Sequence, residues 1–194
     1  MDKEKNATVL NYMRGLHSCL GELIKQDING IADRIFEAYE NNSRIFIMGN
    51  GGSATTASHF ASDLAIGASV HGRRHLRVTS LTDNVAMITS LANDIGYRFV
   101  FEQQLIGQVE EGDIVIGITA SGNSINILKA VEFARNNGAL IMGFIGFGGG
   151  KFEELTDKCI VLSSKDYGQV EDAHLCLVHI VSNLVRKRIA NGFR

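Results

Sequence analysis

Short apolar runs rich in β-branched residues alternate along the chain with segments of helical periodicity. The runs are RIFIM (44–48), HLRVTSL (75–81), DIVIGIT (113–119), ALIMGFIG (139–146) and KCIVLS (158–163). Strands that alternate with helices are joined by crossover connections, and such connections build a mostly parallel sheet. We therefore expect an α/β fold, with a doubly wound, mostly parallel five-stranded sheet flanked by helices.

Both ends of the chain are predicted to be helical. Apolar residues recur at intervals of three and four between residues 6 and 39, with a break near 26–29. This pattern predicts an N-terminal helical hairpin, about 1–43, that packs on the α/β core or on a neighbouring subunit. A long closing helix is expected from Val170 to Ala190, with basic residues near its negative pole. We interpret the whole chain, 1–194, as one domain, since this length can bury a core without disulfides or a structural metal.

Charge and cysteine content narrow the function classes. The formal net charge is −2 and no basic stripe is present, which argues against a nucleic-acid partner. Cys19, Cys159 and Cys176 are odd in number and widely spaced, unlike a disulfide framework or a cysteine metal site. The sequence also shows neither a signal-peptide pattern nor an apolar run near the roughly 20 residues of a membrane span. We expect a cytoplasmic protein without a membrane partner.

Two glycine- and hydroxyl-containing turns follow predicted strands and open predicted helices. The first turn is GNGGS (49–53) and the second turn is TASGNS (119–124). Glycine lets the backbone approach an anion, hydroxyl groups donate to phosphate oxygens, and the positive end of a helix attracts negative charge. In open parallel sheets, ligands bind beyond the carboxyl ends of the strands. The chemistry of both turns suits a phosphate monoester.

Two other interpretations of these turns stay open. Gly49, Gly51 and Ala54 satisfy the G-x-G-x-x-A pattern of dinucleotide-binding folds, which expects an acid roughly 20 residues further on. The best acid here is Asp83, 34 positions after Gly49. Each turn could also be a plain helix entry with a serine cap.

Polar residues on two predicted helices suggest a metal or catalytic site. His59 and Asp63 are four positions apart and share one helix face, where they would meet one ion, one substrate or only each other. On the closing helix, Glu171 and His174 are three apart, whereas Glu171 and His179 lie about 12 Å apart along an ideal helix. Spacing alone favours His174 as the partner of Glu171, with a solvated helix face as the alternative.

The motifs GNGGSATTASHF, LANDIG and TASGNS, followed by the segment from Glu171 to His179, resemble the sugar isomerase (SIS) domain family, most closely its phosphoheptose isomerases. The resemblance implies an SIS-type, flavodoxin-like fold and a homotetramer with active sites at subunit interfaces. It also implies an aldose–ketose isomerase that converts sedoheptulose 7-phosphate into D-glycero-D-manno-heptose 7-phosphate, a precursor of bacterial surface sugars. One divalent metal per subunit, zinc in the family, is the implied cofactor.

The resemblance carries functional residues over position by position. The implied substrate-binding residues are Asn50, Gly51, Gly52, Ser53, Asn93, Asp94, Thr119, Ala120, Ser121 and Ser124. The implied metal ligands are His59, Asp63, Glu171 and His179, and the last three are also the implied catalytic residues. This assignment replaces the spacing preference for His174.

The sequence departs from the family pattern at the implied site. Asp63 stands where the family has glutamate, Glu171 where it has glutamine, Ala120 where it has threonine, and Gly67 where it often has arginine. Two histidines and two carboxylates would suit zinc, and iron or manganese would also accept them. Without a metal, two adjacent carboxylates would repel, and one would hold a proton.

In the implied reaction, Asp63 or Glu171 is the base and His179 is the acid. Two alternatives remain open at this point. One is a non-catalytic sugar-phosphate-binding protein with a regulatory or assembly role. The other is an isomerase of a different sugar phosphate, for which the departures at the site are the argument.

Overall fold

The computed structural model describes residues 3–192, and the side chains of residues 7–192. The strands are β1 (Arg44–Gly49), β2 (Arg77–Ser80), β3 (Ile114–Thr119), β4 (Leu140–Ile145) and β5 (Lys158–Val161). The α-helices are α1 (Lys3–Leu23), α2 (Ile28–Asn41), α3 (Gly52–Ser62), α4 (Val85–Leu91), α5 (Glu102–Leu105), α6 (Ile125–Asn136) and α7 (Tyr167–Asn191). Shorter π or 3-10 turns are η1 (Asp63–Gly67), η2 (Ala92–Gly96), η3 (Tyr97–Phe99) and η4 (Glu153–Leu155).

The strands form one parallel sheet in the order β2-β1-β3-β4-β5. All five predicted strands are present, and β2 is shorter than its apolar run. The direction of winding reverses between β1 and β3, which makes this pair the switch point of the sheet. Gly49 of β1 is in register with Ile118 of β3. The two turns that follow these strands therefore leave the sheet side by side.

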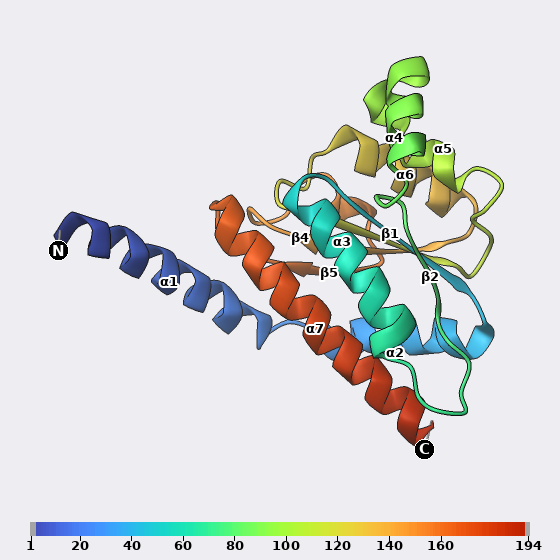
Figure 1. Ribbon diagram of the computed structural model, residues 1–194, viewed down its shortest axis with the longest axis horizontal. Helices are drawn as coiled ribbons and strands as arrows, with labels where there is room; N and C mark the ends of the chain where they lie inside the picture. The colour runs from blue at the N-terminus through green and yellow to red at the C-terminus, as the bar shows by residue number, and fades with distance from the viewer. Residues whose placement is uncertain (1–2, 193–194) are drawn as a thin grey trace.

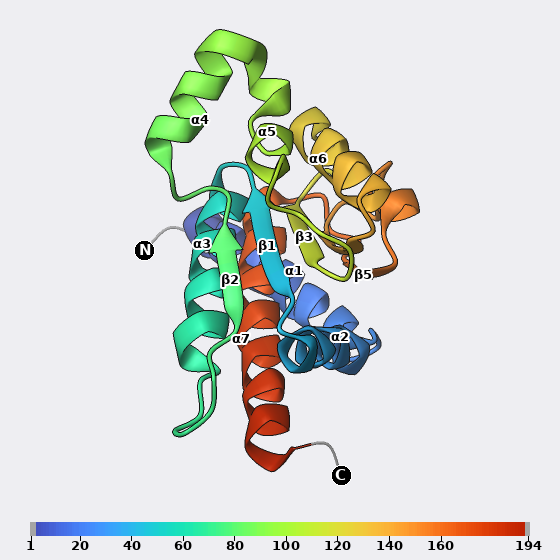
Figure 2. The ribbon, with the colours of Figure 1, turned by 90° about the vertical axis from the view of Figure 1, so that its right-hand side faces the viewer.

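The sheet lies between two helical layers (Figure 2). On one face, Ile47 and Ile116 pack in a core that also includes residues of α2, α3 and α7. On the other face, Phe46 and Val115 pack against α5 and α6. Successive residues of a strand point to opposite faces, so a strand covered on both sides is a continuous apolar run rather than an alternating one. This explains the unbroken apolar runs of the sequence.

The two N-terminal helices are present, with the predicted break between them. Asp27 ends the break by accepting a hydrogen bond from the N–H of Gly30 at 2.9 Å, as the N-cap of α2. The helices do not fold back along each other as a hairpin. Each packs on α7 instead, and α1 extends away from the body of the molecule (Figure 1). The Tyr12 hydroxyl donates to the Asp172 carboxylate at 2.6 Å and ties α1 to the start of α7.

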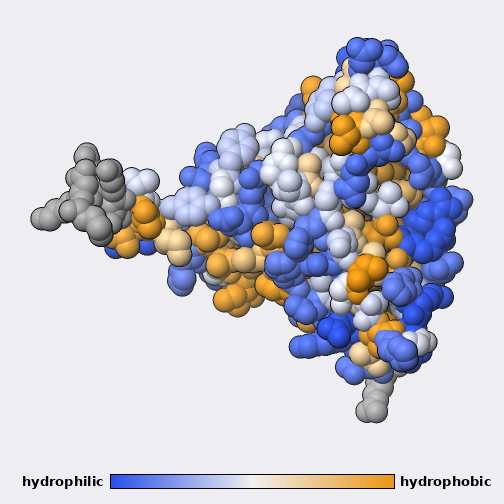
Figure 3. Space-filling model, viewed as in Figure 1, coloured by the Kyte–Doolittle hydropathy of each residue, from blue (hydrophilic) through white to orange (hydrophobic). Residues whose placement is uncertain are grey.

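The exposed part of α1 carries apolar side chains. Val9, Leu10 and Met13 are 61 %, 53 % and 57 % exposed. Figure 3 shows hydrophobic side chains gathered along this projecting helix. Only some of the apolar side chains that predicted α1 are thus buried against the rest of the chain.

The closing helix α7 is confirmed and is longer than predicted. Its N-cap is Asp166, whose side chain accepts the N–H of Gln169 at 3.1 Å, and Arg188 lies in its last turn. It crosses the face of the sheet beside α3 (Figure 1). Among residues 3–192, the structure contains no helix with both the length and the apolar character needed to cross a membrane.

Residues 85–99, here called the projecting segment, comprise α4, η2 and η3. They stand away from the sheet beyond the end of β2 (Figure 2). Within the described chain, α4 and η2 have no buried residue. The segment therefore places its polar residues outside the core.

Candidate active site

A cavity of about 120 Å³ lies at the carboxyl ends of β1 and β3, between the first and second turns. Its lining consists of Asn50, Ser53, Ile118, Thr119, Ala120, Ser121, Ser124, Tyr167 and Glu171. Most of these were singled out from the sequence, whereas Ile118 and Tyr167 were not. Tyr167 is the first residue of α7, and its ring packs edge-on against Phe147. Tyr167 lies outside both turn motifs, so neither motif predicted its place in the cavity.

The first turn depends on its glycines for two different reasons. Gly51 has a φ of +58°, a conformation that side chains rarely adopt. A Cβ on Gly52 would lie 2.2 Å from Oε2 of Glu171, so any larger residue there would displace this carboxylate from its present position. Glu171 of α7 therefore lies directly against the first residue of α3, at the positive end of that helix.

The second turn presents hydroxyl groups to the same cavity. Oγ1 of Thr119 accepts from the N–H of Gly122 at 3.2 Å, and Oγ of Ser121 accepts from the N–H of Asn123 at 3.3 Å. Ser124 is the N-cap of α6, yet its side chain makes no capping bond within the described residues. The hydroxyls and the start of α6 together form a cradle suited to an anion.

Asn50 is held by other side chains. Its Nδ2 donates to Oδ1 of Asn126 at 3.0 Å, and Nδ2 of Asn126 donates to Oδ1 of Asn50 at 2.8 Å. The Tyr97 hydroxyl donates to the same Oδ1 of Asn50 at 2.8 Å. Asn126 and Tyr97 were missed from the sequence. Asparagine is a weak helix former, so the place of Asn126 between two isoleucines at the start of α6 was the only available signal.

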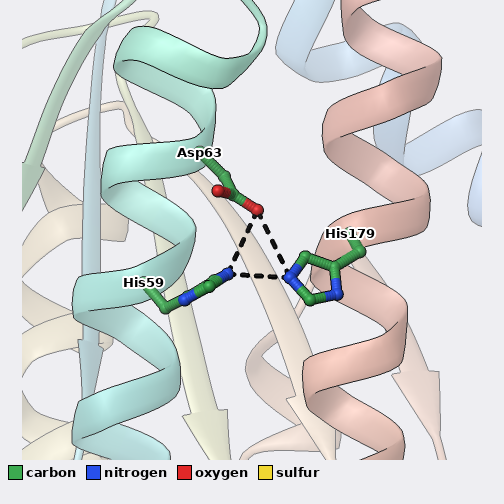
Figure 4. A group of neighbouring side chains, drawn as sticks. All are labelled: His59, Asp63 and His179. Carbon is green, nitrogen blue, oxygen red and sulfur yellow. Dashed lines mark hydrogen bonds and ion pairs between the residues drawn. The ribbon is translucent and has the colours of Figure 1, made fainter.

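A second polar group lies where α3 packs beside α7. The Nε2 atoms of His59 and His179 are 2.8 Å apart, and Oδ2 of Asp63 is 3.3 Å from the first and 3.7 Å from the second (Figure 4). We call His59, Asp63 and His179 the metal-type cluster. In a tetrahedral zinc site with bonds of about 2.0–2.1 Å, two ligand atoms lie about 3.4 Å apart. The three observed separations bracket this value, so the donors fit one divalent ion.

The local backbone around Asp63 is unusual. Helix α3 passes there into the π turn η1, of which Asp63 is the first residue. Such π turns occur frequently at functional sites. A Cβ on Gly67 would lie 3.7 Å from Oδ1 of Asp63, so the position where the family often has arginine borders this carboxylate.

The four predicted metal ligands do not all meet. The metal-type cluster contains three of them, and Glu171 is not among the residues grouped there within the described chain. Since α7 is helical throughout, Glu171 and His179 remain about 12 Å apart along its axis. Glu171 belongs to the cavity instead. The repulsion expected between two adjacent carboxylates does not arise in this arrangement.

His174 does not join Glu171 at the cavity, contrary to the preference from spacing. Its side chain is fully buried, with the ring 6.5 Å from that of Phe144, measured between centroids. Neither ring nitrogen has a hydrogen-bond partner within the described residues. The three-residue spacing is real, but one side chain faces the cavity and the other faces the sheet.

Asn93 and Asp94 lie on η2 of the projecting segment. Nδ2 of Asn93 donates to Oδ1 of Asp94 at 2.8 Å, and both side chains are exposed. Neither belongs to the cavity lining formed by the described residues. Within one chain, these two predicted site residues are therefore hydrogen-bonded to each other and do not line the cavity.

Comparison with known proteins agrees with this geometry. The SIS domain model matches residues 10–146. A phosphoheptose isomerase from Pelobacter propionicus is 36 % identical over 174 residues, which cover 88 % of this chain and 92 % of that protein. The chain belongs to the phosphoheptose isomerase family of SIS-domain proteins. The resemblance found in the sequence is thereby confirmed.

Two further phosphoheptose isomerases, one compared by sequence and one by structure, are also similar to this chain. A phosphoheptose isomerase from Aneurinibacillus thermoaerophilus is 37 % identical over 162 residues, covering 84 % of this chain and 81 % of its own. The solved structure of a phosphoheptose isomerase from Francisella tularensis superposes with a TM-score of 0.83 at 26 % identity, covering 96 % of this chain and all of that one. The predicted fold class of this SIS-domain protein is confirmed.

The buried histidine of this SIS-domain protein makes its stability depend on pH. Burial lowers the pKa of His174 from 6.5 to about 4, and the nearby Ile145 carbonyl offsets this only in part. Between these values the unfolded chain binds more protons than the folded one, so stability is full above pH 6.5 and falls toward pH 4. We expect His174→Leu to reduce the loss of unfolding free energy between pH 7 and pH 4 by about 3 kcal/mol.

Urea denaturation at each pH measures this difference. His17→Gln, at an exposed histidine of α1, is the matched control and should keep the wild-type pH dependence. An unchanged pH dependence in His174→Leu would show that His174 is not held neutral in the folded protein.

Proposed function

We propose that this protein is an aldose–ketose isomerase that interconverts sedoheptulose 7-phosphate and D-glycero-D-manno-heptose 7-phosphate. The observation that carries the proposal is the meeting of the two turns at the switch point of the sheet, with a carboxylate in the same cavity. The curated relatives described above carry the name phosphoheptose isomerase, which supports this substrate.

The cavity suggests how the substrate is held. The hydroxyls of Thr119, Ser121 and Ser124 and the start of α6 bind the phosphate, while Ala120 adds no hydroxyl. The first turn, with the N–H groups that begin α3, faces the remainder of the sugar. Binding the phosphate fixes the reacting end in one orientation, which lowers the barrier to the later proton transfers.

The reaction needs a base for the proton next to the carbonyl, an acid to return it, and groups that stabilise the enediolate. The site offers two carboxylates as the base, Glu171 in the cavity and Asp63 in the metal-type cluster. His179, beside Asp63, is the acid when its Nε2 is not bound to an ion. The two carboxylates are far enough apart to be tested separately.

The metal-type cluster binds one divalent ion per subunit, and zinc is the ion that its chemistry favours. Two imidazole nitrogens and one carboxylate oxygen are the donor types of catalytic zinc sites, which keep a further position open. When bound there, the ion polarises substrate oxygens. His59, Asp63 and His179 are the residues of this chain that hold it.

The protein assembles as a cytoplasmic homotetramer with active sites at subunit interfaces. The exposed apolar side chains of α1 support an interface, because such patches mark interaction sites. Asn93 and Asp94, which stand away from their own cavity, would approach the cavity of a neighbouring subunit. Three free cysteines suit a reducing compartment.

An isomerase of another sugar phosphate is the second candidate. The specific observation that favours it is Gly67, which presents no side chain to Asp63 where the family often has arginine. Comparing turnover of sedoheptulose 7-phosphate with that of pentose and hexose phosphates distinguishes the two substrates.

Isomerisation is tested by incubating the protein with sedoheptulose 7-phosphate in deuterated water. We expect the aldose to appear with deuterium at the carbon next to its carbonyl, as seen by proton NMR. Asp63→Asn, which removes the proposed base, should lower kcat by about 10²–10⁴-fold in protein compared at equal metal content. Glu171→Gln is measured in parallel, to assign the base to one carboxylate.

Glu132→Gln, on the exposed side of α6, is the control and should retain full turnover. Retention of most activity in Asp63→Asn would remove Asp63 from the role of base. Binding of the sugar phosphate without conversion or exchange would instead support a non-catalytic binding protein.

Metal content tests the cluster. We expect His59→Ala and His179→Ala to lose the bound ion in elemental analysis, because each removes one of three ligands. Glu171→Gln should keep it, because Glu171 lies in the cavity. His75→Ala, at an exposed histidine outside the cluster, is the control. Loss of the ion in Glu171→Gln would show that this residue is a fourth ligand.

Assembly is tested on the exposed face of α1. Leu10→Asp places a charge on the apolar patch and should shift the protein from tetramer to smaller species in sedimentation equilibrium. Asn11→Asp adds the same charge at the next, exposed polar position and should leave the tetramer intact. A wild-type monomer, or an unaffected Leu10→Asp tetramer, would contradict the role of this face.

A further inference from the structure

The first and second turns belong to different strand–helix units. The distance between the two turns must therefore be held by a contact that joins these units. The ladder between β1 and β3 aligns the strand ends and stops with them. Asn50 is the first residue beyond β1, and Asn126 is the second residue of α6, 76 positions later in the chain. Asn50 and Asn126 therefore lie beyond the last backbone pairing of β1 with β3, which does not hold them together.

The side chains of Asn50 and Asn126 form a reciprocal amide pair, in which each donates to the other, at 3.0 and 2.8 Å. Asn126 is 3 % exposed, and its Oδ1 also accepts the N–H of Ile127 at 3.1 Å. Its position is therefore fixed by its own helix. A partly buried pair of this kind has directional requirements that an apolar contact lacks.

Tyr97 adds a third element to the pair. Its hydroxyl donates to Oδ1 of Asn50 at 2.8 Å, which connects η3 of the projecting segment to the first turn. Oδ1 of Asn50 thus accepts two hydrogen bonds and Nδ2 donates one, so a single amide hydrogen remains for a ligand. The side chain of Asn50 is mainly a fixed point of the turn, and its neighbours Gly51 to Ser53 are left to face the sugar.

We propose that Asn126 is a positioning residue, which acts through Asn50 to set the distance between the first and second turns, with Tyr97 as an auxiliary. This rests on the proposed function, in which the phosphate occupies the second turn and the rest of the sugar reaches the first. A sugar phosphate then depends on the distance between the turns. Inorganic phosphate, which needs the second turn alone, does not.

The experiment compares two affinities of Asn126→Ala by calorimetry. We expect binding of sedoheptulose 7-phosphate to weaken at least tenfold, and binding of inorganic phosphate to change less than threefold. A lower folded fraction cannot produce this difference, because it reduces the number of sites or weakens both apparent affinities by the same factor. Asn136→Ala, the same substitution at an exposed position of α6, should leave both affinities as in the wild type.

Tyr97→Phe is the milder variant, since it removes one hydroxyl at an exposed position and should fold even where Asn126→Ala does not. We expect it to weaken sugar-phosphate binding two- to fivefold, with no effect on inorganic phosphate. In the Asn126→Ala background it should add nothing, because both residues act through Asn50. Fully additive losses would overturn this shared route.

Equal weakening of both ligands in Asn126→Ala would mean that Asn126 does not set the distance between the two turns, and no weakening of either would mean that it positions nothing. Each result overturns the proposal. Turnover is followed in parallel on the same samples. A wild type that binds the ketose phosphate without converting it would refute the isomerase and leave the affinity difference as the test of Asn126.

Discussion

The parallel pairing of β1 with β3 is the constraint on which the rest of this structure depends. Because the winding reverses at this pair, α3 covers one face of the sheet and α6 covers the other. Their starts diverge from adjacent strand ends and leave a crevice between them. The start of α6 with its turn hydroxyls can then hold an anion, while the first turn and the start of α3 face the same small volume from the other side.

The long helix α7 adds the chemistry that this crevice lacks. Glu171, near its start, reaches the first turn, and His179, two turns further along, meets His59 and Asp63 beside α3. Between them His174 turns inward and is buried against the sheet. One helix therefore supplies a cavity residue, a core residue and a member of the metal-type cluster. The length of helix between Glu171 and His179 keeps the cavity carboxylate away from the cluster.

Much of the fold could be predicted because its signals are local. Strand and helix periods and turn chemistry act over a few residues, so five strands, the closing helix and both turns were correctly placed. His59 with Asp63 was found for the same reason, since four positions make one helical turn. The prediction that the two N-terminal helices form a hairpin was wrong. The apolar stripes of α1 and α2 do not reveal that each helix packs on α7.

By itself, the sequence determined the elements, the two turns and the resemblance to the SIS domain family. Only the tertiary structure decided that β1 and β3 are neighbours and that Glu171 stays apart from His59, Asp63 and His179, with which the resemblance had grouped it. It also showed the link from Asn50 to Asn126. The physical reason is distance along the chain: these contacts join residues 69 to 120 positions apart, and sheet order and helix packing, which no local pattern encodes, bring them together.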